Sequence, residues 1–347
     1  MIMKPQHAIR VLIVDDSGLV RDMIRDILES DPGIVVVGEA TNGMEAIAKV
    51  TTLQPDIVTM DIEMPVMGGL EAIERIIAEN PVPILVVTAL TGVRTAFAAV
   101  SKGALDVIEK PDISLENVRN LIKKIRLLAK VDVAAHLQTM RKQSGPVAVK
   151  ESASQGGQSS GRIVAIAAST GGPQAIYRIL AQLPAGFSVP IIITQHIAEG
   201  FTQGMVDWLN MGTPLKVVVA GHGDVLAPGH VYVNPAEHSM RITEQGMIIL
   251  GSREAGQVYH PSCNVMLASV ASAYRKGAIG LIMSGMGDDG VAGMQAIKAA
   301  GGVTLAQDAK SSVVYGMNRL GVERGHIGKV VALADIPAEL MRRAGIA

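Results

Sequence analysis

The stretch Ile163–Pro173, IVAIAASTGGP, decides how the second half of this chain folds. Its apolar residues 163–168 predict a buried strand, and a helical pattern from Gln174 to Leu183 follows the small residues. This order places Ser169 at the carboxyl edge of a parallel sheet, beside the free N–H groups of a helix N-terminus. Ser169 is therefore a candidate nucleophile, although capping of the helix is the commoner role for such a serine.

Further apolar runs continue this alternation toward the C-terminus. They predict a doubly wound, mostly parallel α/β domain with an antiparallel excursion between about residues 215 and 255. The predicted strands are Val189–Thr194, Leu215–Val219, Val231–Val233, Ile248–Leu250, Ala278–Met283 and Val303–Ala306, and the predicted helices include Thr202–Asn210, Asn264–Tyr274 and Val291–Ala300.

Two more reactive side chains stand at the ends of these strands. His196 follows the run that ends at Gln195, and Asp289 lies in the glycine-rich turn 284–290, SGMGDDG. Together with Ser169 they could act as nucleophile, base and orienting acid, while N–H groups of the turns bind an oxyanion. A G-x-S-x-G elbow is absent, so the chain differs from the usual α/β hydrolases.

The same turn also supports a different function. Residues 285–290 match the G-x-G-x-x-G dinucleotide fingerprint, and Asp308 ends the next apolar run, where a ribose-binding acid would lie. Against this, Asp288 and Asp289 would repel a pyrophosphate. The alternative to a hydrolase is thus a non-catalytic domain that binds a partner or a dinucleotide.

The first half of the chain has the same alternating pattern. Amphipathic helices separate five predicted strands, Ile9–Val14, Ile34–Glu39, Ile57–Met60, Ile84–Thr88 and Asp106–Ile108. Such units predict a doubly wound parallel sheet, with its site at the carboxyl ends of the strands.

Polar residues fall at those carboxyl ends. Asp15 and Asp16 close the first strand, Asp61 the third and Thr88 the fourth, and Lys110 follows the fifth. Three carboxylates at one edge would repel one another unless a hard cation lay among them, and oxygen ligands favour Mg²⁺. A carboxylate beside Mg²⁺, with a lysine and a hydroxyl nearby, can accept a phosphoryl group.

The length of 347 residues and a hydrophobic content of 48% fit two globular domains. Between them, RKQSGPVAVKESASQGGQSSG is too polar to fold alone and is typical of a flexible tether. We therefore predict a first domain at 1–129, a linker at 130–160 and a second domain at 161–347.

Charge and hydropathy exclude several classes of partner. The net charge of −1 gives no electrostatic footprint for nucleic acid, and no apolar run approaches the roughly 20 residues of a membrane span. A single cysteine, Cys263, rules out an intrachain disulfide and fits a reducing compartment. We expect a cytoplasmic monomer without membrane insertion.

The first domain resembles a two-component response-regulator receiver, which has a flavodoxin-like fold of five parallel strands. The resemblance rests on Val14-Asp15-Asp16-Ser17, on residues 60–65 (MDIEMP), on Thr88-Ala89 and on Lys110-Pro111. It implies that a histidine kinase phosphorylates Asp61 and that Thr88 and Lys110 contact the phosphoryl oxygens. It also implies that Asp15, Asp16, Asp61 and the Glu63 carbonyl hold Mg²⁺, and that the Lys110–Pro111 bond is cis. Val107 departs from the family, which often has an aromatic residue there.

The second domain resembles the catalytic domain of chemotaxis protein-glutamate methylesterases. The matching motifs are residues 168–173 (ASTGGP), Gln195-His196 with Gly200-Phe201-Thr202, Pro261-Ser262, residues 285–290 (GMGDDG) and residues 311–317 (SSVVYGM). The resemblance implies Ser169 as nucleophile, His196 as base and Asp289, rather than Asp288, as the acid. It also implies that Thr170 and the Met286 backbone line the site, and it suggests no cofactor in this domain.

The substrate implied is a γ-glutamyl methyl ester on the cytoplasmic helices of chemoreceptors, with deamidation of receptor glutamines as a second activity. The hypothesis for control is that the unphosphorylated receiver covers the Ser169 edge until Asp61 is phosphorylated. Several positions depart from the family pattern. Ser284 stands where threonine is usual, Asn264 where aspartate is usual and Asn318 where proline is usual, and the stretch after Phe201-Thr202 lacks the usual arginine.

Overall fold

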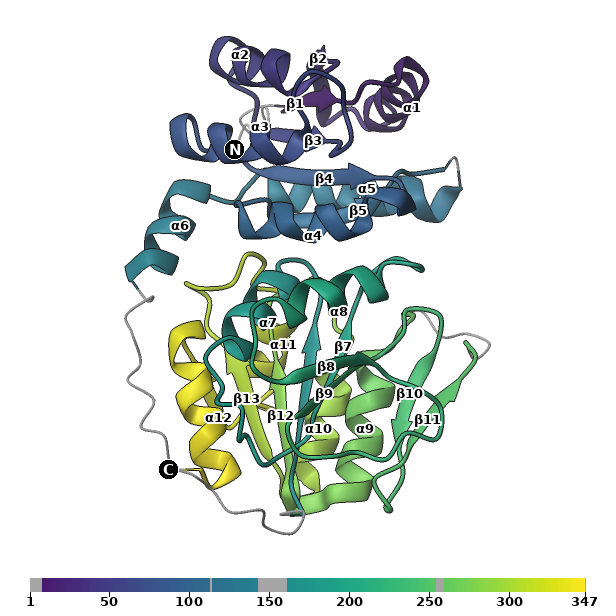
Figure 1. Ribbon diagram of the computed structural model, residues 1–347, viewed down its shortest axis with the longest axis vertical. Coiled ribbons are helices and arrows are strands. Elements are labelled where there is room, and N and C mark those ends of the chain that lie inside the picture. Colours follow the sequence, from purple (N-terminus) through teal and green to yellow (C-terminus); the bar gives the residue numbers. More distant parts are fainter. Residues whose placement is uncertain (1–7, 113, 143–160, 254–258, 347) are drawn as a thin grey trace, which may run out of the picture. The chain divides into compact units, whose positions relative to one another are not determined.

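A parallel sheet forms the centre of the first unit, Met1–Gln138, in the computed structural model (Figure 1). The residues that the structure describes are 8–112, 114–142, 161–253 and 259–346. The strand order is β2-β1-β3-β4-β5, which confirms the predicted flavodoxin-like topology. The strands are β1 (Ile9–Val14), β2 (Ile34–Ala40), β3 (Ile57–Met60), β4 (Ile84–Thr88) and β5 (Asp106–Glu109).

The helices of this unit cover the sheet in two groups. Helices α1 (Gly18–Glu29) and α5 (Leu115–Leu128) contact each other, and α3 (Gly69–Glu79) contacts both α2 (Gly43–Leu53) and α4 (Val93–Ser101). Side-chain oxygens cap the N-termini of several helices. At α1, the Ser17 hydroxyl accepts a hydrogen bond from the Val20 N–H, and at α2 the Asn42 side chain accepts one from the Glu45 N–H. These caps satisfy backbone donors that a helix leaves free at its start.

One helix lies inside the predicted linker. Residues 130–160 are predicted as a tether, but α6 spans Val133–Lys142, so the structure differs there. The Asp132 carboxylate accepts a hydrogen bond from the Ala135 N–H, which helps to start the helix. The rest of the predicted linker, residues 143–160, lies outside the described residues.

The second unit, Thr139–Ala347, is built on a seven-stranded parallel sheet with the order β14-β13-β12-β6-β7-β9-β8. Its strands are β6 (Ile163–Ala168), β7 (Ile191–Gln195), β8 (Lys216–Val219), β9 (His230–Val233), β12 (Ala278–Ile282), β13 (Val303–Gln307) and β14 (Lys329–Val331). The antiparallel part is the separate hairpin of β10 (Ser239–Ile242) and β11 (Ile248–Gly251). The antiparallel part is therefore shorter than the predicted range of about 215–255, because β8 and β9 belong to the parallel sheet.

Helices cover both faces of this sheet (Figure 1). Helix α10 (Val291–Ala299) contacts α9 (Cys263–Tyr274) and α11 (Met317–Glu323), whereas α7 (Gly172–Leu180) contacts α8 (Thr202–Asn210) and α12 (Ile336–Ala344). Right-handed crossovers put these two groups on opposite faces. Strand β6 is wholly buried between them, which explains its unbroken apolar sequence. None of the helices in the described ranges has the length and apolarity that a bilayer crossing requires.

A buried carboxylate on α12 gives a testable prediction about stability. Hydrogen bonds from Arg342, Lys329 and Arg343 outweigh burial and lower the pKa of Glu339 from 4.5 to about 2. A lowered pKa means that Glu339 stabilises the fold above about pH 4.5, and that this contribution is lost as the pH falls toward 2. Because its partners are partly exposed, we expect Glu339→Gln to cost about 2 kcal/mol at pH 7 and much less at pH 3, measured by urea unfolding.

Glu323 on α11 provides the matched control. It pairs with Arg319 across one turn of helix, and both side chains are about half exposed. Such pairs contribute less than about 0.5 kcal/mol, so Glu323→Gln should hardly change the free energy of unfolding. An equal cost for both variants would contradict the assignment to Glu339.

Candidate active site

Ser169 lies directly after the central strand of the second unit. The N-cap of the following helix α7 is Gly171, whose φ of 76° is left-handed, and the helix has no side-chain cap. The alternative role of Ser169 as the helix cap is therefore excluded. A Cβ at Gly171 would lie 2.5 Å from the Val313 Cβ, and one at Gly285 would lie 2.6 Å from the Ser169 Cβ. Both glycines are thus needed for close packing around this serine.

His196 starts at the same edge of the sheet as Ser169. Strands β6 and β7 pair in parallel with Ala168 opposite Gln195, so Ser169 and His196 are the next residues on neighbouring strands. The His196 N–H donates to the Ala168 carbonyl at 3.0 Å, and the Gln195 amide Nε2 donates to the Ser169 carbonyl at 2.9 Å. These bonds fix the two backbones relative to each other beyond the last ladder residues.

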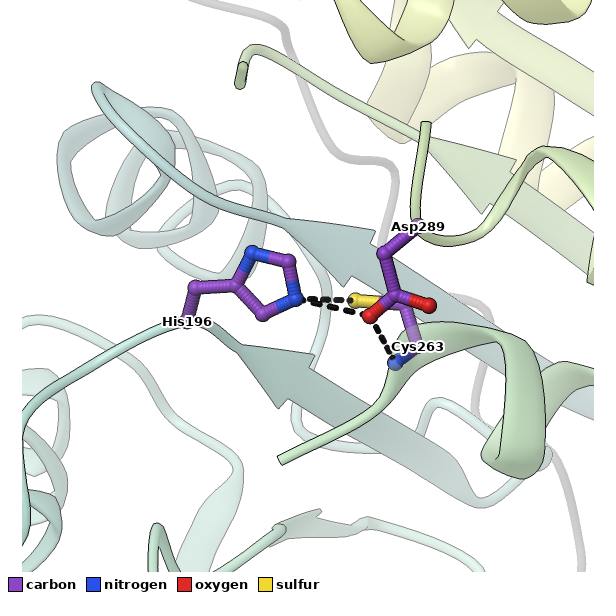
Figure 2. A group of neighbouring side chains, drawn as sticks. All are labelled: His196, Cys263 and Asp289. Carbon is purple, nitrogen blue, oxygen red and sulfur yellow. Dashed lines mark hydrogen bonds and ion pairs between the residues drawn. The ribbon is translucent and has the colours of Figure 1, made fainter. Parts of the chain in front are cut away.

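Asp289 reaches this edge from the turn after β12. Its Oδ2 lies 2.8 Å from Nε2 of His196. Figure 2 shows the carboxylate and the imidazole facing each other. The carboxylate is buried and also accepts hydrogen bonds from the N–H groups of Cys263 and Asn264 and from the Ser262 hydroxyl. Burial alone would raise the pKa of Asp289, but the hydrogen bonds from His196, Asn264 and Cys263 lower it. The carboxylate is therefore ionised at neutral pH and orients the imidazole.

The ionised carboxylate also fixes the protonation pattern of the imidazole. Because an ionised carboxylate can only accept a hydrogen bond, Nε2 carries the hydrogen that faces Asp289 and Nδ1 keeps its free lone pair. Among the described residues, the Ser169 hydroxyl makes no hydrogen bond to the imidazole. Such bonds are often long before substrate binds, so a contact between the Ser169 hydroxyl and the imidazole stays a prediction.

Two predicted site-lining residues also lie at this edge. The Met286 N–H makes no hydrogen bond within the described ranges, and its role as an oxyanion donor stays a prediction. Thr170 is buried, and its carbonyl accepts from the Ser284 hydroxyl at 2.7 Å. That hydroxyl also accepts from the Val314 N–H at 3.0 Å, so the serine that replaces the usual threonine links three segments.

The two asparagine departures have structural roles. Asn264 Oδ1 accepts from the N–H groups of Gly290 and Gly293, at 2.9 and 2.8 Å. Asn318 is fully buried and donates to the Gln307 carbonyl and the Ser312 hydroxyl. Because Asn264 occupies N–H donors at the start of α10, the turn is not open for a pyrophosphate. The dinucleotide alternative loses its binding site.

Two neighbours of His196, Tyr259 and Cys263, are not predicted from the sequence to belong to this site. The Tyr259 ring is parallel to the imidazole, with the centroids 5.4 Å apart. The buried thiol of Cys263 lies 3.6 Å from Nε2 of His196 and points toward it (Figure 2). Neither residue has a spacing motif that could have revealed it, since both approach from a segment distant in sequence.

In the first unit, the carboxylates predicted to bind metal converge. Oxygens of Asp15, Asp16 and Asp61 lie within 4.8 Å of one another. Lys110 Nζ lies 2.7 Å from Asp15 Oδ2 and 2.8 Å from Asp61 Oδ2. Burial raises the pKa of Asp15, helped by the charge of Asp61, although Lys110 and the Ser17 N–H oppose the shift. Three acids with one lysine leave excess negative charge, which suits a divalent cation with oxygen ligands.

Three further predictions concern Thr88, Glu63 and Lys110 at the carboxyl edge of the first sheet. Thr88 is buried at the end of β4, and a Cβ at Gly92 would lie 2.6 Å from its hydroxyl. The Glu63 side chain is exposed, and the role of its carbonyl stays a prediction. The predicted cis bond at Lys110–Pro111 is wrong, because the one cis peptide within the described residues is His260–Pro261. The Lys110 N–H donates to the Thr88 carbonyl at 2.9 Å, which extends the pairing of β4 and β5 by one residue.

Comparisons with known proteins agree with both halves. Residues 164–340 match the CheB methylesterase family, and residues 11–126 match the response regulator receiver domain. A protein-glutamate methylesterase/protein-glutamine glutaminase of Paramagnetospirillum magneticum is 46% identical over 99% of this chain and 98% of its own. One from Myxococcus xanthus is 39% identical over 96% of each chain.

A solved structure agrees as well. The crystal structure of the Thermotoga maritima CheB methylesterase catalytic domain has a TM-score of 0.51 at 32% identity, covering 53% of this chain and 98% of that one. This match extends over the unit that contains Ser169, His196 and Asp289. The chain therefore belongs to the CheB methylesterase family, with a receiver domain preceding the methylesterase domain.

Proposed function

We propose that this protein is a phosphorylation-controlled serine esterase. It hydrolyses γ-glutamyl methyl esters on the cytoplasmic helices of chemoreceptors, releases methanol, and deamidates receptor glutamines by the same route. The observation that carries the proposal is the buried Asp289 carboxylate bound to His196 Nε2 at 2.8 Å, on the strand end next to Ser169. The names of the full-length relatives support both activities.

The geometry suggests the following roles. Ser169 attacks the ester carbonyl, and Nδ1 of His196 takes its proton. Asp289 holds the ring and stabilises the imidazolium. The Met286 N–H and groups near Thr170 bind the developing oxyanion, and the imidazolium then protonates the methoxide oxygen, which departs as methanol. Water hydrolyses the acyl-enzyme by the reverse proton path.

The receiver unit is proposed to control this reaction. Asp15, Asp16 and Asp61, with the Glu63 carbonyl, would hold Mg²⁺, which neutralises charge on an incoming phosphoryl group. Asp61 accepts that group from a chemotaxis histidine kinase, and Lys110 and Thr88 contact its oxygens. The protein acts as a cytoplasmic monomer with no nucleic-acid partner.

Regulation through phosphorylation of Asp61 predicts how an Asp61→Asn variant should behave. It lacks the carboxylate that accepts the phosphoryl group, so a small phosphodonor should no longer stimulate it. We expect a stimulation ratio near one, against a clear increase in the unmodified protein, in a methanol-release assay on methylated receptor membranes.

Glu74 offers the matched control in the same unit, since it is exposed and pairs with Lys102 away from the carboxylate cluster. Glu74→Gln should keep the full stimulation. Full activity of the intact, unphosphorylated protein, with no response to the phosphodonor, would reject the proposed control.

A further inference from the structure

Three potential metal ligands meet beside the imidazole. Ligand atoms of His196, Cys263 and Asp289 all lie within 4.8 Å of one another (Figure 2). Nε2 of His196 is 2.8 Å from Asp289 Oδ2 and 3.6 Å from Cys263 Sγ. The thiol plays no part in the proposed hydrolysis, and its sulfur lies 3.6 Å from the Thr194 carbonyl oxygen as well as 3.6 Å from the imidazole nitrogen.

The donor set is one that zinc prefers. Imidazole, thiolate and carboxylate bind Zn²⁺ at about 2.0–2.3 Å in tetrahedral sites. Ligand atoms of such a site are then roughly 3.3–3.6 Å apart. The sulfur and nitrogen already have this separation, and the carboxylate oxygen would have to withdraw by several tenths of an ångström. A hard ion such as Mg²⁺ would disfavour the sulfur and the nitrogen.

Charge and protons also balance. The Cys263 thiol loses one proton to solvent and the Nε2 hydrogen of His196 moves to Nδ1, so Zn²⁺ binds one thiolate, one carboxylate and one neutral imidazole. The site then has no net charge, which suits its burial. The Cys263 thiol is buried, and it gives up its proton as the metal binds.

We propose that zinc binds His196, Cys263 and Asp289 and thereby switches the esterase off. Zinc on Nε2 leaves the imidazole proton on Nδ1, so the ring can no longer accept a proton from Ser169. The metal also withdraws Asp289 from its orienting role. The side chain of His196 is 17% exposed, whereas Cys263 and Asp289 are buried, so the imidazole is the part of this group that solvent reaches. The proposed inhibition depends on the proposed esterase function. The proposed metal site does not depend on it.

Cobalt titration tests the site without any activity. Because Cys263 is the single cysteine, any sulfur-to-Co²⁺ charge-transfer absorption of the full chain reports this residue. We expect the band in the EDTA-treated protein, its displacement by Zn²⁺, and its loss in Cys263→Ala and Cys263→Ser. His196→Ala should weaken Co²⁺ binding at least about tenfold. His222→Ala, which removes an exposed histidine, should not change it.

The inhibition is tested in the methanol-release assay. Zinc should lower the rate of the EDTA-treated protein, and Cys263→Ala should need at least about tenfold more zinc for half inhibition, each variant being compared with its own zinc-free rate. Absence of the cobalt band, or equal zinc sensitivity of the Cys263 variants, would overturn the proposal. If the protein showed the cobalt band but had no esterase activity, the result would support the metal site and contradict the proposed function.

Discussion

Ser169→Ala should lower kcat for methanol release by at least about 10⁴-fold, because removal of the nucleophile from a triad leaves only oxyanion and binding contributions. The residue lies in a tight turn between β6 and α7, with the Gly285 backbone packed against its Cβ. Alanine keeps this Cβ, so the fold should be unaffected. Binding of the methylated receptor should also persist, and the assay is methanol release together with receptor pull-down.

Ser252 supplies the control for this substitution. It is exposed just after β11, and Ser252→Ala makes the same chemical change in the same unit. Its turnover should equal that of the unmodified protein. If Ser169→Ala still released methanol at the normal rate, another group would have to attack the ester. The assignment of Ser169 as the nucleophile would then be wrong.

Asp289→Asn should lower kcat by about 10⁴-fold, because a neutral amide no longer stabilises the imidazolium or selects the Nε2 tautomer. Both carboxylate oxygens are already occupied, one by His196 and the Cys263 N–H and the other by the Ser262 hydroxyl and the Asn264 N–H. An amide nitrogen at either position faces a backbone donor, which leaves a buried N–H unpaired. We therefore expect a further cost of about 1–3 kcal/mol in the free energy of unfolding.

The neighbouring aspartate gives a sharp comparison. Asp288 is exposed, 4.0 Å from Arg324 and 3.5 Å from the Tyr259 hydroxyl. Asp288→Asn should change kcat by less than a few fold and stability by less than about 0.5 kcal/mol. If the two substitutions had equal effects on methanol release, the assignment of Asp289 as the orienting acid would be wrong.

Strands that are buried on both faces were predictable from sequence. An unbroken apolar run such as Ile163–Ala168 has few alternative structures, and its bounds agree with β6. The edge strand β14 and the hairpin strand β10 were missed, because three or four residues with mixed polarity resemble loop sequence. Helix α6 was missed for a similar reason, since its amphipathic pattern merges into the polar stretch that follows.

For the candidate site, the sequence could predict which side chains end on the same sheet edge. It could not predict what approaches them from elsewhere. Cys263 and Tyr259 reach His196 through tertiary packing alone, and no periodicity links residues more than 60 positions apart. The same holds for Asn264, whose side chain replaces the expected aspartate and caps the N–H groups of α10.

Both reactive side chains follow the middle strand of their sheets, Asp61 after β3 and Ser169 after β6. Middle strands of parallel sheets have neighbours on each side, so their amide protons exchange with solvent only when the whole unit opens. Fraying of outer strands such as β8 or β14 leaves the reactive groups in register. On heating, each unit should therefore lose its activity in the same cooperative step in which its sheet unfolds. A partly unfolded form that retains the sheet but is inactive should not accumulate.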